Sequence, residues 1–437
     1  MKKISCIAIS LLMILSLASC GQTPSSPAPA TTPSSSETVP SSSTAPAESA
    51  GSDKAYDGEA VNLFIRMRSE ANAAGLQELI DYIKEQSGIE VNLIAAPTNY
   101  SDFVTKITAS LSSDDDTYDL IHIDEFSIKN FAGAGFLEPI TDVMEPVAQH
   151  YPQVIMESIS KYENDYYTMP IDLNMMYFYV NQKMLDEKGV KAPTTKEEFV
   201  EVAKKLTEGD VYGYGAAWGK GGQLYNDVYR FVYLFGGDML DWENPQNKEA
   251  LQFMYDLLYT HKVTPVAVLG DVYDPLNQKM INGMYGMANN WASLGLVVPD
   301  DKWGTEIVVA PMPTFETNKT ISAGWHIGIN AFSNHIPAAK EVVKLWSSKE
   351  GQFFNLKYEG ASYDEVLAMP EAVELNRLGK ALSEYVAAGS PTPRVPIDRN
   401  SELQEIVETY AGSYLSNQIT LDECMSQAAP QIKALVG

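Results

Sequence analysis

Histidine and cysteine are scarce in this chain. Its 437 residues include five histidines, which stand far apart, and three cysteines. No His-Glu-x-x-His pair, Gly-x-Ser-x-Gly elbow or Cys-His arrangement occurs, so the zinc-protease and serine-hydrolase signatures are missing. We therefore expect no enzyme, no metal and no cofactor.

Basic residues are also few. The chain has 31 lysines and arginines against 57 aspartates and glutamates, which gives a formal net charge of −26. Such a surface repels nucleic acid and anionic lipid headgroups, because both carry negative charge. The composition excludes nucleic acid as a partner and leaves neutral or cationic ligands.

The N-terminus contains a short apolar segment. Residues 4–17 are apolar and follow Lys2 and Lys3, but a membrane-spanning helix needs about 20 apolar residues. A basic start, a short apolar core and small residues before Cys20 are typical of an export signal. Leu-Ala-Ser-Cys at 17–20 resembles a bacterial lipobox, which implies a signal peptide at 1–19 and lipidation of Cys20. Ordinary cleavage near Ala18 is the alternative.

The segment at 20–56 contains mostly Ser, Thr, Pro and Ala. It has too few large apolar residues to form a core, so we expect a disordered tether that holds the folded body off the membrane. With Cys6 in the signal and Cys20 lipidated, Cys424 has no partner for an intramolecular disulfide. The fold must therefore depend on core packing.

Strand and helix patterns alternate from residue 57 onward. Strand patterns occupy 61–65, 89–93 and 118–123, and helical patterns occupy 76–83 and 103–111. This βαβαβ order predicts an α/β fold with a parallel sheet and right-handed crossovers. Ligands collect beyond the carboxyl ends of such strands. The residues that follow the strand patterns are Arg66, Met67, Arg68, Ser69, Asn99, Tyr100, Asp124 and Glu125.

The stretch from Asn164 to Val202 combines an aromatic strand pattern with a clear helix start. Its apolar run ends in Tyr179-Val180-Asn181, and Thr195 and Glu198 stand at capping-box spacing before an amphipathic helix. We predict a strand that feeds a pair of helices.

This stretch resembles the interlobe crossover of extracellular solute-binding proteins of the maltose-binding-protein type. Further segments resemble that family in the same order, from about residue 60 to 437. These segments are 119–121 with 132–140, 281–291, 308–313, 322–329, 338–352, 391–396 and 419–425.

The resemblance implies a periplasmic-binding-protein-like fold of type II, with the ligand in a cleft between two α/β lobes. It implies an N-terminal lobe at 57–173 and about 309–370, and a C-terminal lobe at 174–308 and about 371–437. It further implies a monomeric lipoprotein on the extracytoplasmic face of the cell membrane. Such a protein captures a sugar or oligosaccharide by hinge closure and delivers it to the permease of an ABC importer.

Carbohydrate recognition needs aromatic faces for sugar rings and polar groups for hydroxyls. The candidate platforms are Tyr100, Trp218, Trp291 and Trp325, and the candidate polar contacts are Arg68, Asp124, Glu125, Asp172, Asn174 and Arg394. Asn174 stands where the resemblance implies a carboxylate. For the polar residues, a solvated loop or an interlobe ion pair is the alternative interpretation.

Two other functions stay open at this point. A polyamine is a possible ligand for Asp124, Glu125 and Asp172, although Arg66 and Arg68 at the same rim argue against a cation. A surface glycoside hydrolase needs only two carboxylates about 5 to 9.5 Å apart across a cleft. The acidic run at 114–119 lacks the glycine and the final glutamate of an EF-hand loop, so we expect no calcium there.

Overall fold

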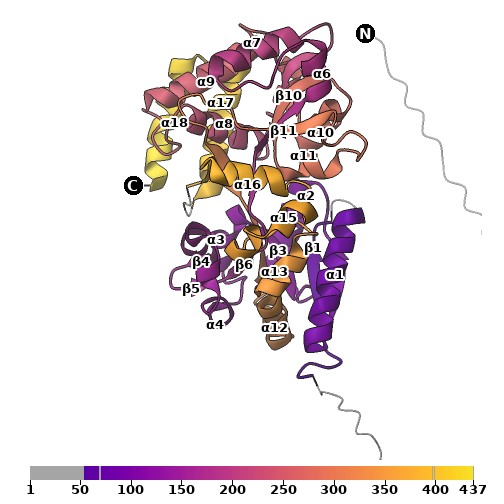
Figure 1. Ribbon diagram of the computed structural model, residues 1–437. Coiled ribbons are helices and arrows are strands. Elements are labelled where there is room, and N and C mark those ends of the chain that lie inside the picture. Colours follow the sequence, from indigo (N-terminus) through magenta and orange to yellow (C-terminus); the bar gives the residue numbers. More distant parts are fainter. Residues whose placement is uncertain (1–53, 68–69, 396, 398, 437) are drawn as a thin grey trace, which may run out of the picture. The chain divides into compact units, whose positions relative to one another are not determined.

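The computed structural model describes residues 54–67, 70–395, 397 and 399–436 (Figure 1). The expected signal peptide, Cys20, Arg68 and the expected tether up to residue 53 lie outside the described residues. Within the part that is described, no helix is long and apolar enough to cross a membrane.

The first half of the fold is built on a five-stranded sheet with the order β2-β1-β3-β13-β6. Strand β1 pairs in parallel with β2 and β3, whereas β13 runs antiparallel to β3 and β6. The predicted βαβαβ run is present as β1, α1, β2, α2 and β3. The elements named here are β1 (Ala60–Ile65), α1 (Glu70–Ser87), β2 (Glu90–Ala95), α2 (Tyr100–Ser112), β3 (Leu120–Asp124), β6 (Thr168–Pro170) and β13 (Trp325–Ile329).

Helices from two separate parts of the chain cover this sheet. Helix α1 packs against α12 and α13, which come from residues more than 200 positions later. The first core contains buried side chains from 61–171 and 325–372. The remaining elements around it are α3 (Glu125–Gly133), α4 (Thr141–Met144), α5 (Gln153–Ile155), the π-turn at Met156–Ser160, β4 (Lys161–Tyr162), β5 (Asp165–Tyr166), α12 (Ile336–Trp346), α13 (Lys349–Asn355), α14 (Asp364–Leu367) and α15 (Pro370–Leu375).

The second half has its own sheet, with the strand order β11-β8-β10-β9. Its strands are β8 (Tyr177–Asn181), β9 (Tyr212–Gly215), β10 (Tyr285–Asn290) and β11 (Ile307–Ala310). Helices surround this sheet and complete a second core, which contains buried side chains from 175–321 and 378–432. They are α6 (Gln182–Glu187), α7 (Lys196–Leu206), α8 (Gln223–Leu234), α9 (Pro245–Leu258), α10 (Tyr273–Ile281), α11 (Ala292–Val297), α16 (Gly379–Ala387), α17 (Asn400–Leu415) and α18 (Leu421–Val436).

The predicted start of α7 is confirmed in detail. The Thr195 hydroxyl accepts from the Glu198 backbone N–H at 3.2 Å. The Glu198 carboxylate accepts from the backbone N–H and the hydroxyl of Thr194, at 2.8 and 2.7 Å. Both capping side chains therefore form hydrogen bonds. The Glu198 carboxylate bonds to Thr194, whereas in an ideal capping box it bonds to the N-cap residue, which here is Thr195.

A small third sheet lies where the chain passes between the two cores. Strand β12 (Thr320–Ala323) pairs with β7 (Asn174–Met175) on one side and β14 (Pro391–Pro393) on the other. Leu173 packs against both cores. The lobe boundaries near 309 and 370 stay a prediction, and the second core runs on to Ile321 before the chain returns at Trp325.

His326 lies on β13 of the first sheet, between β3 and β6, and is fully buried. Its Nδ1 lies 3.1 Å from the Thr168 hydroxyl and 3.5 Å from the Ser160 hydroxyl, and its Nε2 has no hydrogen-bond partner among the described residues. Burial lowers the pKa of His326 from 6.5 to about 3. The ring is therefore neutral in the folded protein at every ordinary pH.

We expect His326 to make the protein sensitive to acid. Below pH 6.5 the unfolded chain binds a proton at this ring and the folded chain does not, so acid favours unfolding until the pH falls to about 3. The free energy of unfolding falls by about 1.4 kcal/mol per pH unit in this range. Denaturant unfolding of wild type and His326→Gln at pH 7, 6 and 5 measures it. Between pH 7 and pH 5, the free energy of unfolding of wild type is expected to fall by about 2 kcal/mol relative to that of His326→Gln. A difference between the two proteins that does not change with pH would contradict the prediction.

Candidate functional site

A cavity of about 330 Å³ is lined by residues of both halves and of the connecting strands. Its size is typical of small-molecule sites. Of the ten candidate ligand contacts, Tyr100, Asp124, Asn174, Trp291, Trp325 and Arg394 line it, together with Arg66 and Asn99 from the strand ends. The βαβ topology explains the first two, because they follow β2 and end β3 at the carboxyl edge of the parallel strands.

Asp124 combines a structural and a cavity-facing role. It caps α3, since its Oδ1 accepts from the Phe126 backbone N–H at 2.9 Å. Burial raises the pKa of Asp124, and the positive charge of Arg394 opposes that rise. Burial and the charge of Asp124 together raise the pKa of Tyr100 well above its usual value, and the two side chains are hydrogen-bonded. Tyr100 therefore keeps its proton and donates to Asp124.

Glu125 and Arg394 form a buried ion pair beside the cavity. The Glu125 Oε1 accepts from Arg394 Nε at 2.9 Å and from Nη2 at 2.6 Å, and the two side chains are only 6% and 4% exposed. Arg394 Nη1 also donates to Asn226 Oδ1 on α8 at 2.7 Å, and Glu125 Oε2 accepts from the Gly324 N–H at 3.2 Å. The pair thus joins the start of α3 to the segment after β14 and to α8. For Glu125 and Arg394 this arrangement matches the alternative interpretation given above, an interlobe ion pair.

The nominated tryptophans differ in how much of each ring is open. The Arg66 guanidinium lies 5.0 Å from the Trp325 ring centre, and Phe103 packs edge-on at 5.6 Å, so Trp325 is largely covered. Trp291 is half-buried at the end of β10, with its backbone carbonyl accepting from the Tyr179 hydroxyl. Trp218 is buried in the second core, where its Nε1 donates to Asp227 at 3.1 Å, and it lies outside the cavity lining.

The two polar residues at the crossover are both engaged with backbone. The Asp172 carboxylate accepts from the Trp325 N–H at 2.5 Å and is buried outside the cavity lining. Asn174 lines the cavity, and its Oδ1 accepts from the N–H groups of Met175 and Ala292 at 2.8 and 3.2 Å. Asn174 therefore ties β7 to the start of α11, next to Trp291.

Several cavity residues were not nominated from sequence. They are Phe126, Gln223, Asn226, Tyr273, Asp274 and Gln404. Asn226 lies on α8 and reaches the cavity. Its neighbours Tyr225, Asp227 and Arg230 on α8 do not line the cavity. Tertiary packing decides which side chains of α8 face the cavity, because this helix is buried on nearly every side.

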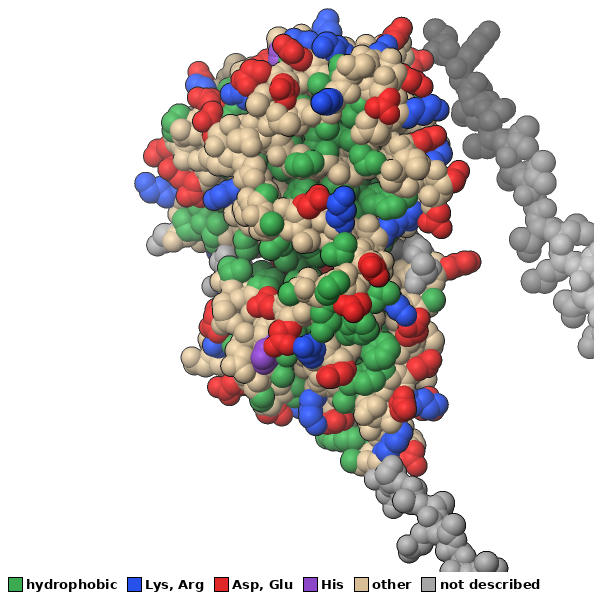
Figure 2. Space-filling model, viewed as in Figure 1, with side chains coloured by type: hydrophobic (Ala, Val, Ile, Leu, Met, Phe, Trp, Pro, Cys, Tyr) green, Lys and Arg blue, Asp and Glu red, His purple; other side chains and the backbone are tan. Residues whose placement is uncertain are grey.

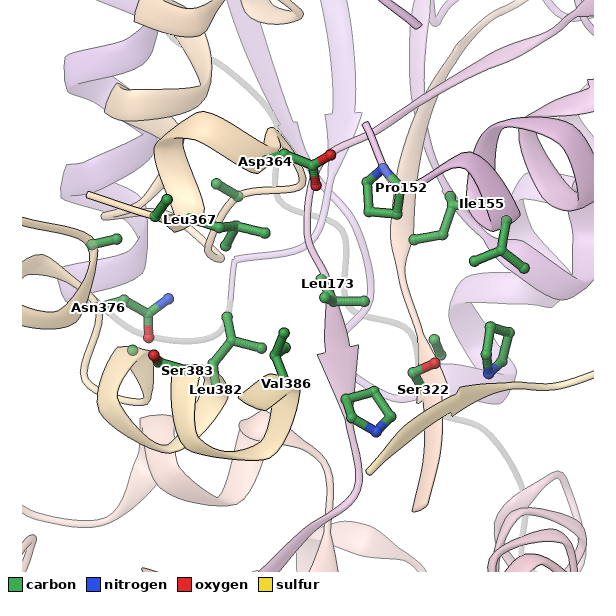
Figure 3. A pocket seen from close by; sticks show the side chains of 18 of the residues that line it. Pro152, Ile155, Leu173, Ser322, Asp364, Leu367, Asn376, Leu382, Ser383 and Val386 are labelled. Carbon is green, nitrogen blue, oxygen red and sulfur yellow. The ribbon is translucent and has the colours of Figure 1, made fainter. Parts of the chain in front are cut away.

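A second cavity, of about 600 Å³, lies against the connecting strands and has a mainly apolar lining. Figure 3 shows Leu173, Leu382 and Val386 facing it, with Asp364, Asn376 and Ser383 among its few polar side chains. Hydrophobic side chains also gather in the hollow between the two halves on the face that Figure 2 shows. The smaller cavity is the better candidate for a polar solute, because charged and amide groups from both halves converge there.

Comparison with known proteins places the chain in a family. The model of the bacterial extracellular solute-binding protein family matches residues 68–353, more than half of the 437 residues. The chain belongs to the bacterial extracellular solute-binding protein family.

Two curated relatives of this solute-binding protein carry names that state a ligand. An arabinooligosaccharide-binding protein of Halalkalibacterium halodurans is 25% identical over 256 residues, which is 54% of each chain. A maltotriose-binding protein of Pyrococcus abyssi is 26% identical over 195 residues, 43% of this chain and 40% of the relative. The solute-binding protein thus spans about half the length of the curated relatives it matches.

Solved structures establish the fold. Maltose-bound MalE3 of Thermotoga maritima superimposes with a TM-score of 0.76 at 23% identity, over 86% of this chain and 99% of the other. The GacH receptor of Streptomyces glaucescens gives 0.72 at 20% identity, over 86% and 98%. The predicted two-lobe α/β fold of type II is therefore confirmed, and the candidate cavity lies between the lobes of this solute-binding protein.

Proposed function

We propose that this solute-binding protein captures a sugar or oligosaccharide in the 330 Å³ cavity and delivers it to an ABC importer. The observation that carries the proposal is the combination of a partly exposed aromatic ring with polar groups from both lobes. Trp291 offers the ring, and Asp124 and Asn174 supply polar groups beside it. The names of the two curated relatives support the same class of ligand.

Capture works by hinge closure in this proposal. A ligand that contacts both lobes favours the state in which the lobes enclose it, and the permease recognises that state. The chain passes between the cores at the small β7-β12-β14 sheet, so rotation there changes the distance between the lobes. Lipidation at Cys20 holds the monomeric protein at the extracytoplasmic face of the membrane.

A cationic ligand such as a polyamine fits the cavity less well. Glu125 is neutralised by Arg394 at 2.6 Å, and Arg66 lines the same cavity. A glycoside hydrolase needs a pair of carboxylates on either side of the scissile bond. Glu125 is committed to Arg394, which removes one of the two adjacent acids from that role. Assay for new reducing ends on incubation with oligosaccharides tests this alternative directly.

Titration of tryptophan emission with mono- and oligosaccharides tests the proposed function. A saturable change with at least one sugar is the expected result. A response to polyamines or amino acids with none to any sugar would overturn the carbohydrate assignment.

Trp291→Ala is expected to weaken sugar binding about 10- to 100-fold, because stacking on a half-buried aromatic ring contributes about 1 to 3 kcal/mol. Isothermal titration calorimetry measures the change with the best sugar of the panel. Tyr82→Ala is the control, since Tyr82 is a partly buried aromatic on α1 that packs against Phe354 and lies outside the cavity. Equal losses in both variants would contradict a ligand-contacting role for Trp291.

A further inference from the structure

Helix α17 carries three polar side chains at four-residue spacing, Asn400, Gln404 and Glu408, which we call the α17 polar stripe. Residues at this spacing share one face of a helix. The two outer members hold the start of α8. The Asn400 Oδ1 accepts from the Tyr225 hydroxyl at 3.0 Å, and the Glu408 carboxylate accepts from the N–H groups of Gly222 and Gly221 at 2.6 and 3.2 Å.

The two glycines form a tight loop at the wall of the cavity. Gly221 and Gly222 have φ values of 101° and 103°, a region that residues with a side chain rarely adopt. With the Gln223 amide turned so that its nitrogen faces this loop, the nitrogen donates to the carbonyl oxygens of Lys220 and Gly221 at 3.0 and 3.2 Å. The loop thus presents backbone and no side chain to the cavity, and its polar groups are bonded within the protein.

Glu408 also stabilises the helix that follows this loop. Gly222 is the N-cap of α8 and has no side chain to cap it. The Glu408 carboxylate accepts from the N–H groups of Gly222 and of Gly221 before it, so a negative charge lies at the positive end of the helix. Asn226, which fixes Arg394, stands one turn further along the same helix. The geometry of this wall therefore depends on α17.

Gln404 is the central member of the stripe and the one that lines the cavity. A methyl group placed on Gly222 would lie 3.9 Å from its Nε2 and 4.0 Å from its Oε1, so the amide lies directly beside the glycine loop. The side chain is partly buried. Across the residues that the structure describes, no group forms a hydrogen bond with this amide.

We propose that Gln404 is a ligand-contacting residue of this solute-binding protein and that Glu408 positions the wall beside it. The inference rests on the proposed function and deepens it. A neutral amide both donates and accepts hydrogen bonds, as a sugar hydroxyl does. Arg394 and the Asn174 carbonyl oxygen are committed to protein partners, whereas the Gln404 amide is available to the ligand.

Gln404→Met tests the contact, because it keeps the length of the side chain and removes both hydrogen-bonding groups. Calorimetry with the best sugar of the panel is expected to show binding about 5- to 30-fold weaker than wild type. Gln427→Met is the matched control, since Gln427 is exposed on α18 and is not among the residues that line the cavity. Unchanged binding by Gln404→Met would overturn the assignment.

Deoxy sugars distinguish a direct contact from a change of shape. The analogue that lacks the hydroxyl bound by Gln404 is expected to lose affinity for wild type but not for Gln404→Met. Equal losses for both proteins with every deoxy analogue would overturn the contact. If wild type binds no sugar at all, the proposed function fails, whereas sugar binding that is indifferent to Gln404 removes only this inference.

Glu408→Gln tests positioning. The amide oxygen accepts from one of the two loop N–H groups, but the amide nitrogen is itself a donor and leaves the other N–H group without its acceptor. We expect weaker sugar binding in this variant and a non-additive effect when it is combined with Gln404→Met. A merely structural role would lower affinity by the same factor with or without Gln404, and that additivity would overturn the positioning role.

Discussion

Replacing Asp227 with alanine is expected to lower the free energy of unfolding by about 3 to 5 kcal/mol. Asp227 and Arg230 lie inside the second core, with side chains that are 1% and 2% exposed. The Asp227 Oδ1 accepts from Arg230 Nε and Nη2 at 3.0 and 2.7 Å, and its Oδ2 accepts from Trp218 Nε1 at 3.1 Å. Alanine at this position leaves the buried indole N–H without its acceptor and the buried guanidinium without its carboxylate, although Arg230 Nη2 still donates to the Tyr214 hydroxyl at 2.8 Å.

Guanidinium chloride unfolding of the two proteins measures this loss. Lys248→Ala is the control, because its ion pair with Asp422 is 51% and 83% exposed and such pairs contribute about 1 kcal/mol or less. The double variant Asp227→Leu/Arg230→Met is expected to recover much of the stability, because it buries no unpaired charge. A loss below about 1 kcal/mol in Asp227→Ala would contradict the account.

Arg394→Met is expected to lower the free energy of unfolding by about 3 to 5 kcal/mol and to weaken ligand binding as well. The substitution leaves the Glu125 carboxylate buried without its cation. It also removes the bond to Asn226 and the guanidinium that lies 3.4 Å from the Phe126 ring centre. The same guanidinium lies 5.6 Å from the Trp291 ring centre, so the proposed sugar platform loses a neighbour.

Arg399→Met is the matched control for this change, five residues later in the sequence. Arg399 pairs with Glu402 in an exposed bridge, with side chains 50% and 52% exposed, so its loss is expected to cost about 1 kcal/mol or less. Adding Glu125→Gln to Arg394→Met is expected to restore part of the stability, since it removes the orphaned charge. Unfolding curves and calorimetric titration of all three variants are the measurements, and equal effects at 394 and 399 would refute the prediction.

The stretch from 164 to 202 illustrates how far sequence reasoning reached. The helix start at Thr195 was predictable, because capping and periodicity are local properties. The apolar run before it predicts one strand, but it contains β6, β7 and β8, each in a different sheet. A continuous apolar run does not indicate which neighbour each residue pairs with, so only tertiary packing divides it.

The candidate site divides in a similar way. Tyr100 and Asp124 reach the cavity because the carboxyl ends of parallel strands meet at one edge, a rule that a βαβαβ pattern already implies. Trp218 and Asp172 had suitable chemistry but are buried away from it. The spacing of Asn400, Gln404 and Glu408 was visible in the sequence, although nothing local indicated that this face meets the cavity.

The sequence by itself determined the α/β class and the succession of family-like segments, because periodicity, caps and segment order are properties of neighbouring residues. The tertiary structure decided which charged groups are partners and which face the ligand. Glu125 and Arg394 are 269 positions apart, and their pairing exists only once the first lobe, the connecting strands and α8 have packed together. That packing commits both charges to the protein and leaves Trp291, Asp124 and Gln404 lining the cavity.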